Sequence, residues 1–210
     1  MRFLSLLIAG ATAICLASTA AAEDRTLAPA RLSSLSVSGG VRVEAIAGPV
    51  RSVTLSGEAE ELSHTRLRET KTGVEVERRC TFGCNSRRNK LTLRVVSPDL
   101  SELVLAQGVD ATVTGVSAPD FKLVAKQGVE LTVTGQCQSL IIDGAMGVSL
   151  DASGLQCQTA LVKGAMGADI DFFASEKADV SASMGASVRI RGGAKDVTSK
   201  ASLGGSIERD

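Results

Sequence analysis

The chain contains no tryptophan and no tyrosine, and only five of its 210 residues are phenylalanine. A core without large rings has to be built from smaller side chains. Valine, alanine, serine and threonine fill much of the chain, and β-branched residues pack well on the pleated surface of a sheet, so the composition favours stacked β-structure. The missing rings are also the usual platforms for sugars, which argues against polysaccharide chemistry.

An excess of one charge is lacking as well, and histidine is rare. The 23 lysines and arginines balance the 23 aspartates and glutamates, so no overall field favours nucleic acid as a partner. The one histidine, His64, lies in a polar stretch without a serine or cysteine in a catalytic motif, and we expect it at the surface. No phosphate loop, nucleotide fingerprint or nucleophile elbow is present, and the sequence predicts no cofactor.

Apolar runs are short, and the clearest one stands at the N-terminus. Arg2 precedes a mostly apolar stretch, residues 3–16, which is too short for a membrane span and is followed by Ala20-Ala21-Ala22. This pattern is typical of a secretory signal peptide over residues 1–22, with cleavage after Ala22. We therefore expect a periplasmic or extracellular protein whose mature part, residues 23–210, forms one domain without a membrane span.

Glycine, in contrast, is abundant, and six glycines return at a nearly constant spacing in similar segments such as VAKQGVELTVTG. The successive steps are 20, 19, 20, 18 and 19 residues. A period of about twenty that is sustained over six copies is typical of a solenoid. These glycines are Gly108, Gly128, Gly147, Gly167, Gly185 and Gly204.

Inside each copy, apolar and polar residues alternate. Phe121 and Leu123, for example, flank Lys122, which is the period of a strand with one buried face. Strands that return every twenty residues can pair in parallel with the next copy, about 4.8 Å away. The sequence therefore predicts an all-β parallel β-helix with about 18–20 residues per coil: a first coil and a β-rich excursion over residues 30–97, then six regular coils over residues 98–210.

The motif GAMG occurs twice, one period apart. By strict alternation Met146 and Met166 face the core and fill one stacked column. The glycines that begin each copy also face the core. The glycine that ends each copy turns the chain. Gln107 and Gln127 take the methionine position in earlier copies, where we expect their amides to bond to each other up the column.

In the excursion, two alternating runs, TGVEVER and NKLTLRVV, flank the segment RCTFGCNSRR, and we predict a β-hairpin with a long loop. Two interpretations of the loop stay open. It is either a solvated tip closed by a Cys80–Cys84 disulfide, or a contact patch for an anionic partner such as lipopolysaccharide, a cell-wall polymer or another protein. Two thiols are too few ligands for zinc. The candidate patch comprises Arg78, Arg79, Arg87, Arg88 and Lys90.

Cys137 and Cys157 occur in GQCQS and GLQCQT, at nearly the same phase of consecutive coils. Stacked positions lie about one strand spacing apart, which is within the Cα range of a disulfide. An even number of cysteines after the signal peptide also favours disulfides in an exported chain. We predict a Cys137–Cys157 bridge across adjacent coils.

Asp151 and Asp171 share an outward column four residues past the glycine, and Arg189 is next in line. Like charges one layer apart need a cation or an arginine nearby. The ladder is therefore either a solvated column relieved by Arg189, or a site like those of β-helix polysaccharide enzymes or of bound calcium.

The stretches SVSGGVRVE and LTLRVVSPDLSELVLAQGVDATV, followed by repeated Gly-Val and Gly-Ala steps, resemble the DUF2807 family, the auto-transporter adhesin head GIN domain. The similarity covers Leu32 to Ile207. It implies a right-handed parallel β-helix in an exported bacterial protein and an adhesin-like role, and it supplies no catalytic residues. The literal Gly-Ile-Asn triplet is replaced here by GVD, GVE, GVS, GAD, GAS and GGS.

Three functional hypotheses follow. The first is a non-enzymatic binding module of the cell envelope, whose partner is an envelope protein or an anionic polymer. The second is a polysaccharide-active enzyme that uses the Asp151–Asp171–Arg189 ladder. The third is a scaffold that self-associates through the open edge of its last coil, although the charges of Glu208, Arg209 and Asp210 would blunt this edge.

Overall fold

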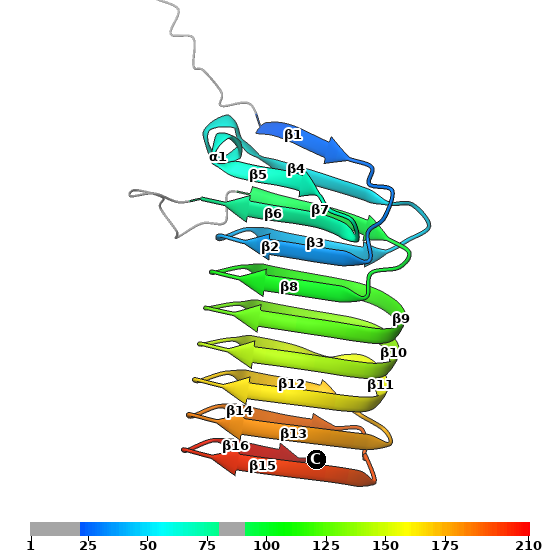
Figure 1. Cartoon of the computed structure of the whole chain (residues 1–210), viewed down its shortest axis with the longest axis vertical. Helices are drawn as coiled ribbons and strands as arrows, with labels where there is room; N and C mark the ends of the chain where they lie inside the picture. Colours follow the sequence, from blue (N-terminus) through cyan, green and yellow to red (C-terminus); the bar gives the residue numbers. More distant parts are fainter. Residues whose placement is uncertain (1–21, 80–90) are drawn as a thin grey trace, which may run out of the picture.

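The computed structural model describes residues 22–79 and 91–210, and residues 1–21 of the predicted signal peptide lie outside this part. The sixteen strands of the described residues form one sheet, which coils into a β-solenoid of about five turns and confirms the predicted fold (Figure 1). The elements are β1 (Ala22–Leu27), β2 (Ser34–Ser38), β3 (Arg42–Ala47), β4 (Ser52–Glu58), α1 (Ala59–Ser63), β5 (Thr65–Glu69), β6 (Gly73–Arg78), β7 (Leu91–Ser97), β8 (Glu102–Ala106), β9 (Asp110–Lys126), β10 (Glu130–Ala145), β11 (Ser149–Ala165), β12 (Asp169–Phe173), β13 (Lys177–Ser183), β14 (Ser187–Arg191), β15 (Asp196–Ser202) and β16 (Ser206–Arg209).

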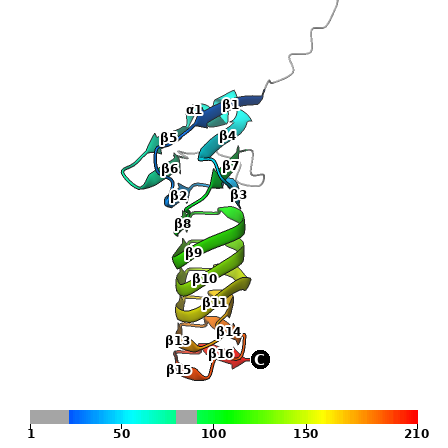
Figure 2. The ribbon, with the colours of Figure 1, turned by 90° about the vertical axis from the view of Figure 1, so that its right-hand side faces the viewer.

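The solenoid has two broad faces, which we call front and back as they lie in Figure 1. Strands β2, β6, β8, β13 and β15 lie on the front, and β3, β7, β12, β14 and β16 lie on the back. The long strands β9, β10 and β11 run from the back around the right edge to the front. The chain crosses the front from right to left and returns behind while it descends, so the coil is right-handed. Figure 2 shows the same stack from its side.

At the left edge, each regular coil turns through two residues with positive φ, such as Met146 (φ 65°) and Gly147 (φ 70°). Both conformations are left-handed, which is the geometry of a tight two-residue turn and explains the periodic glycine. The corners stack in register because each bonds to the next: the N–H of Met146 donates to the carbonyl of Ala165 (3.3 Å), and that of Gly147 to Met166 (3.1 Å). The residues before the six glycines are Gln107, Gln127, Met146, Met166, Met184 and Leu203.

The prediction that Met146 and Met166 face the core is wrong. Their side chains are 39% and 44% exposed, and Gln107 and Gln127 are exposed too, so the expected buried amide column does not form. The tight turn places two residues at its tip, and both point away from the core. Alternation resumes in phase after the tip because these two residues replace one inward and one outward position.

The core between the two faces is built from columns of small and aliphatic side chains, as the alternation predicted. Gly144 and Gly164 face this core, and a Cβ at Gly144 would lie 2.9 Å from Cδ1 of Ile170, so the faces approach too closely there for a side chain. The first inward column after the first five of these corners is almost fully buried and consists of Val109, Val129, Val148, Ala168 and Ala186.

The predicted hairpin between residues 72–78 and 89–96 is also wrong. Strand β6 pairs in parallel with β2 on the front, and β7 pairs in parallel with β3 on the back, so the two strands form one further coil. A hairpin and a coil show the same alternation on both sides of a loop, and alternation does not specify the pairing partner. The hairpin of this region is β5–β6, whose turn is closed by a hydrogen bond from the Thr70 N–H to the Gly73 carbonyl (2.7 Å).

The two ends of the solenoid are closed differently. At the N-terminal end, β4 pairs antiparallel with β7, β1 pairs antiparallel with β4, and Leu62 of α1 is fully buried. At the C-terminal end, inward positions become polar: Ser199 lies opposite Val180, and Arg209 lies opposite Ile190. The guanidinium of Arg209 donates to a carbonyl of the preceding turn.

Candidate functional surfaces

The predicted aspartate ladder exists on the back face. Asp151 lies opposite Asp171, Asp171 lies opposite Arg189, and Arg189 lies opposite Glu208 in successive parallel strands. The 20-residue period was thus sufficient to place these side chains in one outward column.

The ladder is an ion-pair network rather than an open carboxylate site. Arg191 holds Asp171 with two hydrogen bonds of 2.8 and 2.7 Å, while Arg189 lies 3.6 Å from Asp171 and 3.2 Å from Glu208. The Asp171 carboxylate raises the pKa of Arg191 above its ordinary value, so the guanidinium keeps its charge. The sequence reasoning missed Arg191. Arg191 lies diagonally across from Asp171, within the reach of a long side chain on the same face. The sequence signal for it was its spacing from Arg189, because alternate residues of a strand share one face.

Asp151 is held by a neighbour in its own strand, β11. The hydroxyl and the backbone N–H of Ser153 both donate to its Oδ1, at 2.6 and 3.0 Å, and these bonds lower the pKa of the Asp151 carboxyl. Glycoside hydrolysis needs one carboxyl whose pKa is raised, so that it can deliver a proton at neutral pH. Asp151 has the opposite shift, which does not fit the role of the acid.

The described residues do not assemble a hard-cation site either. Within residues 22–79 and 91–210, no three His, Cys, Asp or Glu side chains gather closely enough to hold a metal ion. His64 is exposed at the end of α1, as predicted, and its carbonyl accepts a hydrogen bond from the Arg79 N–H (3.0 Å). Over the same ranges, no helix has the length and apolar character needed to cross a membrane.

The basic patch expected around residues 78–90 loses its first member. The Arg78 side chain is only 4% exposed and forms an ion pair with Glu61 of α1, because it points inward at the end of β6. Arg79 is exposed and lies 3.0 Å from Glu77. The remaining members, Arg87, Arg88 and Lys90, and the predicted Cys80–Cys84 disulfide lie outside the described residues.

The predicted bridge between Cys137 and Cys157 is present. The two residues are directly opposed in β10 and β11, with a Cα–Cα distance of 4.5 Å. The bridge joins adjacent coils on the edge opposite the tight corners. Such a disulfide fits an oxidising compartment.

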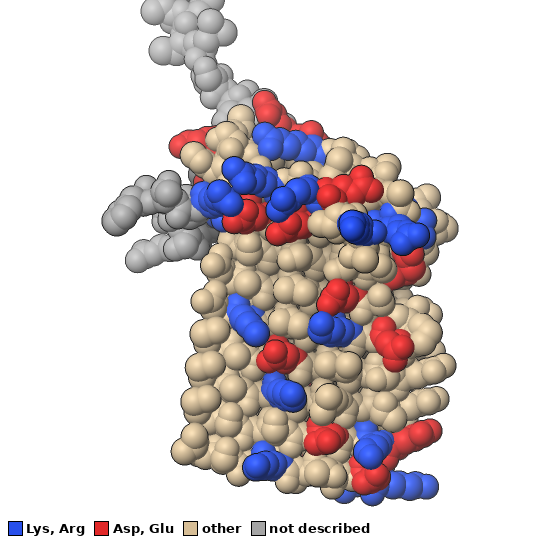
Figure 3. Space-filling model, viewed as in Figure 1, with Lys and Arg blue, Asp and Glu red and all other residues tan. Residues whose placement is uncertain are grey.

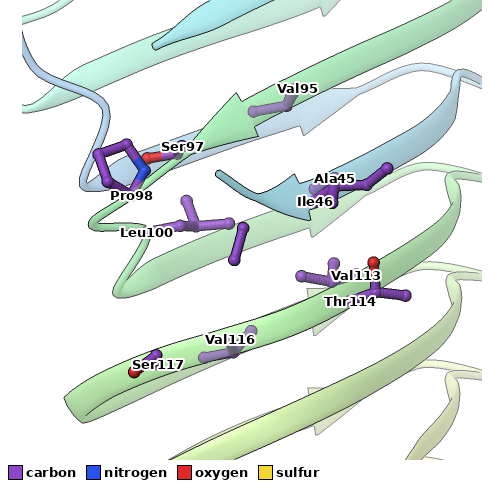
Figure 4. A pocket seen from close by; sticks show the side chains of 11 residues that line it. Ala45, Ile46, Val95, Ser97, Pro98, Leu100, Val113, Thr114, Val116 and Ser117 are labelled. Carbon is purple, nitrogen blue, oxygen red and sulfur yellow. The ribbon is translucent and has the colours of Figure 1, made fainter. Parts of the chain in front are cut away.

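The cavities are small or shallow. The enclosed pocket of Figure 4 lies where β3, β7 and β9 meet the connection from Pro98 to Leu100, and its volume of about 10 Å³ holds no more than about one water molecule. Two open depressions are larger. One of about 360 Å³ on the back face lies between Arg42, Glu44 and Glu130, and one of about 350 Å³ lies beside the disulfide.

The front face carries an outward aliphatic patch, which we call the front patch: Val104, Val124, Ile141 and Leu161. Val104 stacks on Val124 and Ile141 stacks on Leu161 in neighbouring outward columns. Ile141 and Leu161 are 40% and 38% exposed. Figure 3 shows charges of both signs concentrated at the N-terminal end of this face and again at its lower right, with fewer charges between them.

Four charged side chains around the front patch form two ion pairs, and the exposed Lys163 and Asp179 continue the same two columns in the next coils. Lys122 lies 3.0 Å from Glu102, and Lys126 lies 3.5 Å from Asp143, in each case across one coil step. These pairs flank the aliphatic side chains, of which Ile141 and Leu161 are exposed and Val104 and Val124 are half-buried.

The sequence profile of the DUF2807 family, described as "Putative auto-transporter adhesin, head GIN domain", matches residues 31–194, and the chain belongs to this family. The resemblance seen in the sequence is thereby confirmed. None of the curated proteins matches the chain significantly.

Solved structures share the fold. A "putative adhesin" from Bacteroides fragilis superposes with a TM-score of 0.70 at 11% identity, over 91% of this chain and 98% of that one. A "putative adhesin" from Parabacteroides distasonis gives a TM-score of 0.54 at 10% identity, over 90% and 97% of the two chains. The family and these neighbours are described as adhesins and not as enzymes.

Proposed function

We propose that the protein is an exported, non-enzymatic, adhesin-like module that binds a protein of the cell envelope through the front patch. The observation that carries the proposal is the front patch itself: four aliphatic side chains point outward from a flat face, and four charged side chains around them form two ion pairs with one another. An apolar patch with a polar rim is typical of a protein-binding surface.

The back-face ladder supports binding over catalysis. Asp171 is occupied by Arg191, and the pKa of Asp151 is lowered, so neither aspartate is set up as a proton donor. The enzyme hypothesis needs both residues in an open site. A binding module needs only a rigid face, which the stacked coils supply.

A protein partner fits the described surface better than an anionic polymer. Arg78 is committed to an internal ion pair, Arg79 lies beside Glu77, and Arg68 lies 2.8 Å from Glu75. Basic side chains whose charge is already balanced attract a polyanion weakly. The aliphatic side chains of the front patch, in contrast, gain free energy when a protein partner removes them from water.

Export rests on the N-terminal signal pattern and on the Cys137–Cys157 bridge, which suits an oxidising compartment. Strand β1 begins at Ala22, so cleavage after Ala22 would leave Glu23–Leu27 to pair with β4. The mass of the mature chain purified from its own cells should correspond to residues 23–210. A mature chain that retains residues 1–22 would contradict export by this route.

The binding proposal is tested by adding charge to one face at a time. An Ile141→Lys/Leu161→Lys variant alters the front patch, and a Thr112→Lys/Thr132→Lys variant adds the same charge to exposed positions of the back face. Labelled protein is titrated onto isolated envelopes, with thermal unfolding followed to confirm that each variant folds.

We expect the front variant to bind at least about tenfold more weakly, because truncating a central contact typically costs more than about 1.4 kcal/mol. The back variant should bind as the wild type does. Equal affinities for the two variants would overturn the front patch as the binding surface.

A further inference from the structure

The methionines of this chain have an unusual distribution. The sequence contains four, and all except Met1 stand at the tips of consecutive corners: Met146, Met166 and Met184. Their side chains are 39%, 44% and 47% exposed. A residue type that serves only as core filler would be scattered through the inward columns, where this chain places none.

The fold by itself does not call for methionine at these tips. The left-handed conformation is most easily adopted by glycine, asparagine or aspartate, and a bulky residue there costs about 1 kcal/mol or more. The chain itself shows two other solutions at equivalent corners, glutamine at Gln107 and Gln127 and leucine at Leu203. An exposed thioether is moreover prone to oxidation. Three successive sulfur atoms therefore need a reason beyond turn geometry.

The corners hold the three side chains in one stack. The Gly147 N–H donates to the Met166 carbonyl, and the Gly167 N–H donates to the Met184 carbonyl, both at 3.1 Å. Hydrogen-bonded neighbours in such a stack lie about 4.8 Å apart. Methionine has three rotatable bonds beyond its Cα, so sulfur atoms that start from adjacent layers can converge on one point.

The residues that directly flank the three methionines in the chain are small and uncharged. The residues before the three methionines are Ala145, Ala165 and Ser183, and a Cβ built on the glycine after each would meet nothing within 4 Å. In Figure 3 the left edge formed by these corners carries no charged side chain below its upper coils. A ligand at the tips would thus meet three thioethers, whereas the nearby oxygen donors, the Ser183 hydroxyl and the exposed Asp169 carboxylate, are hard groups that a soft cation does not prefer.

We propose that Met146, Met166 and Met184 form a three-thioether site for a soft monovalent cation of the Cu(I) or Ag(I) type. Thioethers are soft, uncharged ligands that select Cu(I) over hard divalent ions, and three neutral donors suit a single positive charge. Leu203 ends the ligand column in the next layer. The site is on the left edge and is independent of the front patch.

The site is tested with silver, which needs no reductant. Cys15, Cys80 and Cys84 are replaced by serine so that thiols do not compete for the metal. Silver nitrate is titrated into the unprocessed chain carrying ¹³C-methyl methionine. We expect the three corner methyl signals to shift together and to saturate at one silver ion per chain, while the Met1 signal follows only at excess. Shifts of all four signals in parallel would show that silver binds any exposed thioether, and would overturn the site.

The glutamine and leucine residues that this chain has at equivalent corners suggest the control substitutions. Met166→Leu keeps the corner apolar and removes the central sulfur, whereas Leu203→Gln alters the neighbouring corner without touching a ligand. Loss of an outer-shell partner alone costs about 10–100-fold in metal affinity, so Met166→Leu should weaken silver binding at least about tenfold. Leu203→Gln should leave it unchanged.

Unchanged silver affinity in Met166→Leu would contradict the proposal, as would the absence of binding by the parent. A different use of the edge would be indicated if Met166→Gln, but not Met166→Leu, weakened attachment to envelopes. In that case the row of corner methionines would serve as an apolar contact surface and not as a metal site.

Discussion

At the scale of single residues, the period of the glycines was predictable and the direction of their neighbours was not. A glycine every twenty residues indicated a turn that needs positive φ, and the structure has that turn. Strict alternation then placed Met146 in the core, whereas the tip of a two-residue turn points outward. Alternation describes strands, and it fails where two successive residues are both left-handed.

Alanine substitutions at two glycines with different surroundings distinguish the cost of backbone strain from the cost of steric overlap. Gly167 (φ 72°) has open space where a Cβ would lie, whereas a Cβ on Gly135 (φ 143°) would overlap the Val116 carbonyl. Gly167→Ala should lower the free energy of unfolding by about 1 kcal/mol. Gly135→Ala should lower it by about 3 kcal/mol or more, because the backbone has to move. Urea unfolding of the two variants checks the order, and equal costs would contradict it.

Arg78 provides a test of burial. The sequence placed it in an exposed basic loop, as a member of the possible binding patch, and the structure instead pairs it with Glu61 of α1. Arg78→Met leaves the Glu61 carboxylate without its partner and should cost about 3–5 kcal/mol of stability. The double variant Arg78→Met/Glu61→Leu should recover most of this loss. Thermal unfolding of both decides, and a neutral single variant would show that Arg78 is solvated.

At the scale of elements, phase could be predicted from the sequence and pairing could not. Cys137 and Cys157 were predicted to face each other because they share a phase of the repeat, and they do. Strands β6 and β7 have equally clear alternation, yet their partners are β2 and β3. The coil of β2 and β3 lies between two coils that come later in sequence, and local pattern holds no information on that order.

The disulfide should stabilise the junction of two coils. It closes a loop with a sequence separation of 20 residues, for which the loss of chain entropy in the unfolded state corresponds to roughly 3 kcal/mol. Cys137→Ala/Cys157→Ala should therefore lower the free energy of unfolding by up to about that amount while the circular dichroism spectrum stays β-rich. An unchanged urea midpoint would show that the stacked strands hold this junction without the bridge.

At the scale of the whole molecule, carboxyl groups held by ion pairs and hydrogen bonds make the free energy of unfolding depend on pH. Arg51 lowers the pKa of Asp99 and Lys122 lowers that of Glu102, while Ser153 lowers the pKa of Asp151. In each case the unfolded chain takes up the proton first, so the stabilisation is complete above the ordinary carboxyl pKa and is lost as the pH falls through the lowered value.

The free energy of unfolding should therefore be nearly constant from about pH 7 to about pH 5 and should fall below about pH 4. Urea midpoints across this range measure the effect. Ser153→Ala should make the acid loss slightly smaller, because it removes one of the causes of the shift. A stability that rises on acidification would contradict the assignment of these carboxyl groups.

Function is also a property of the whole molecule, and it was the least predictable from sequence. The aspartate ladder was found by its period, but only the structure showed that Arg191 occupies it. The front patch escaped notice because its members come from β8, β9, β10 and β11 and meet only when the coils stack. Outward aliphatic residues in separate strands resemble ordinary variation until the columns are known.

The claim that the front face meets the partner is tested most directly inside the exporting cell. A photo-cross-linking amino acid is placed at position 161 on the front face or at position 132 on the back face, and adducts are identified after irradiation. We expect an adduct with one envelope protein from position 161 and none from position 132. An adduct from position 132 alone, or none from either position, would contradict it.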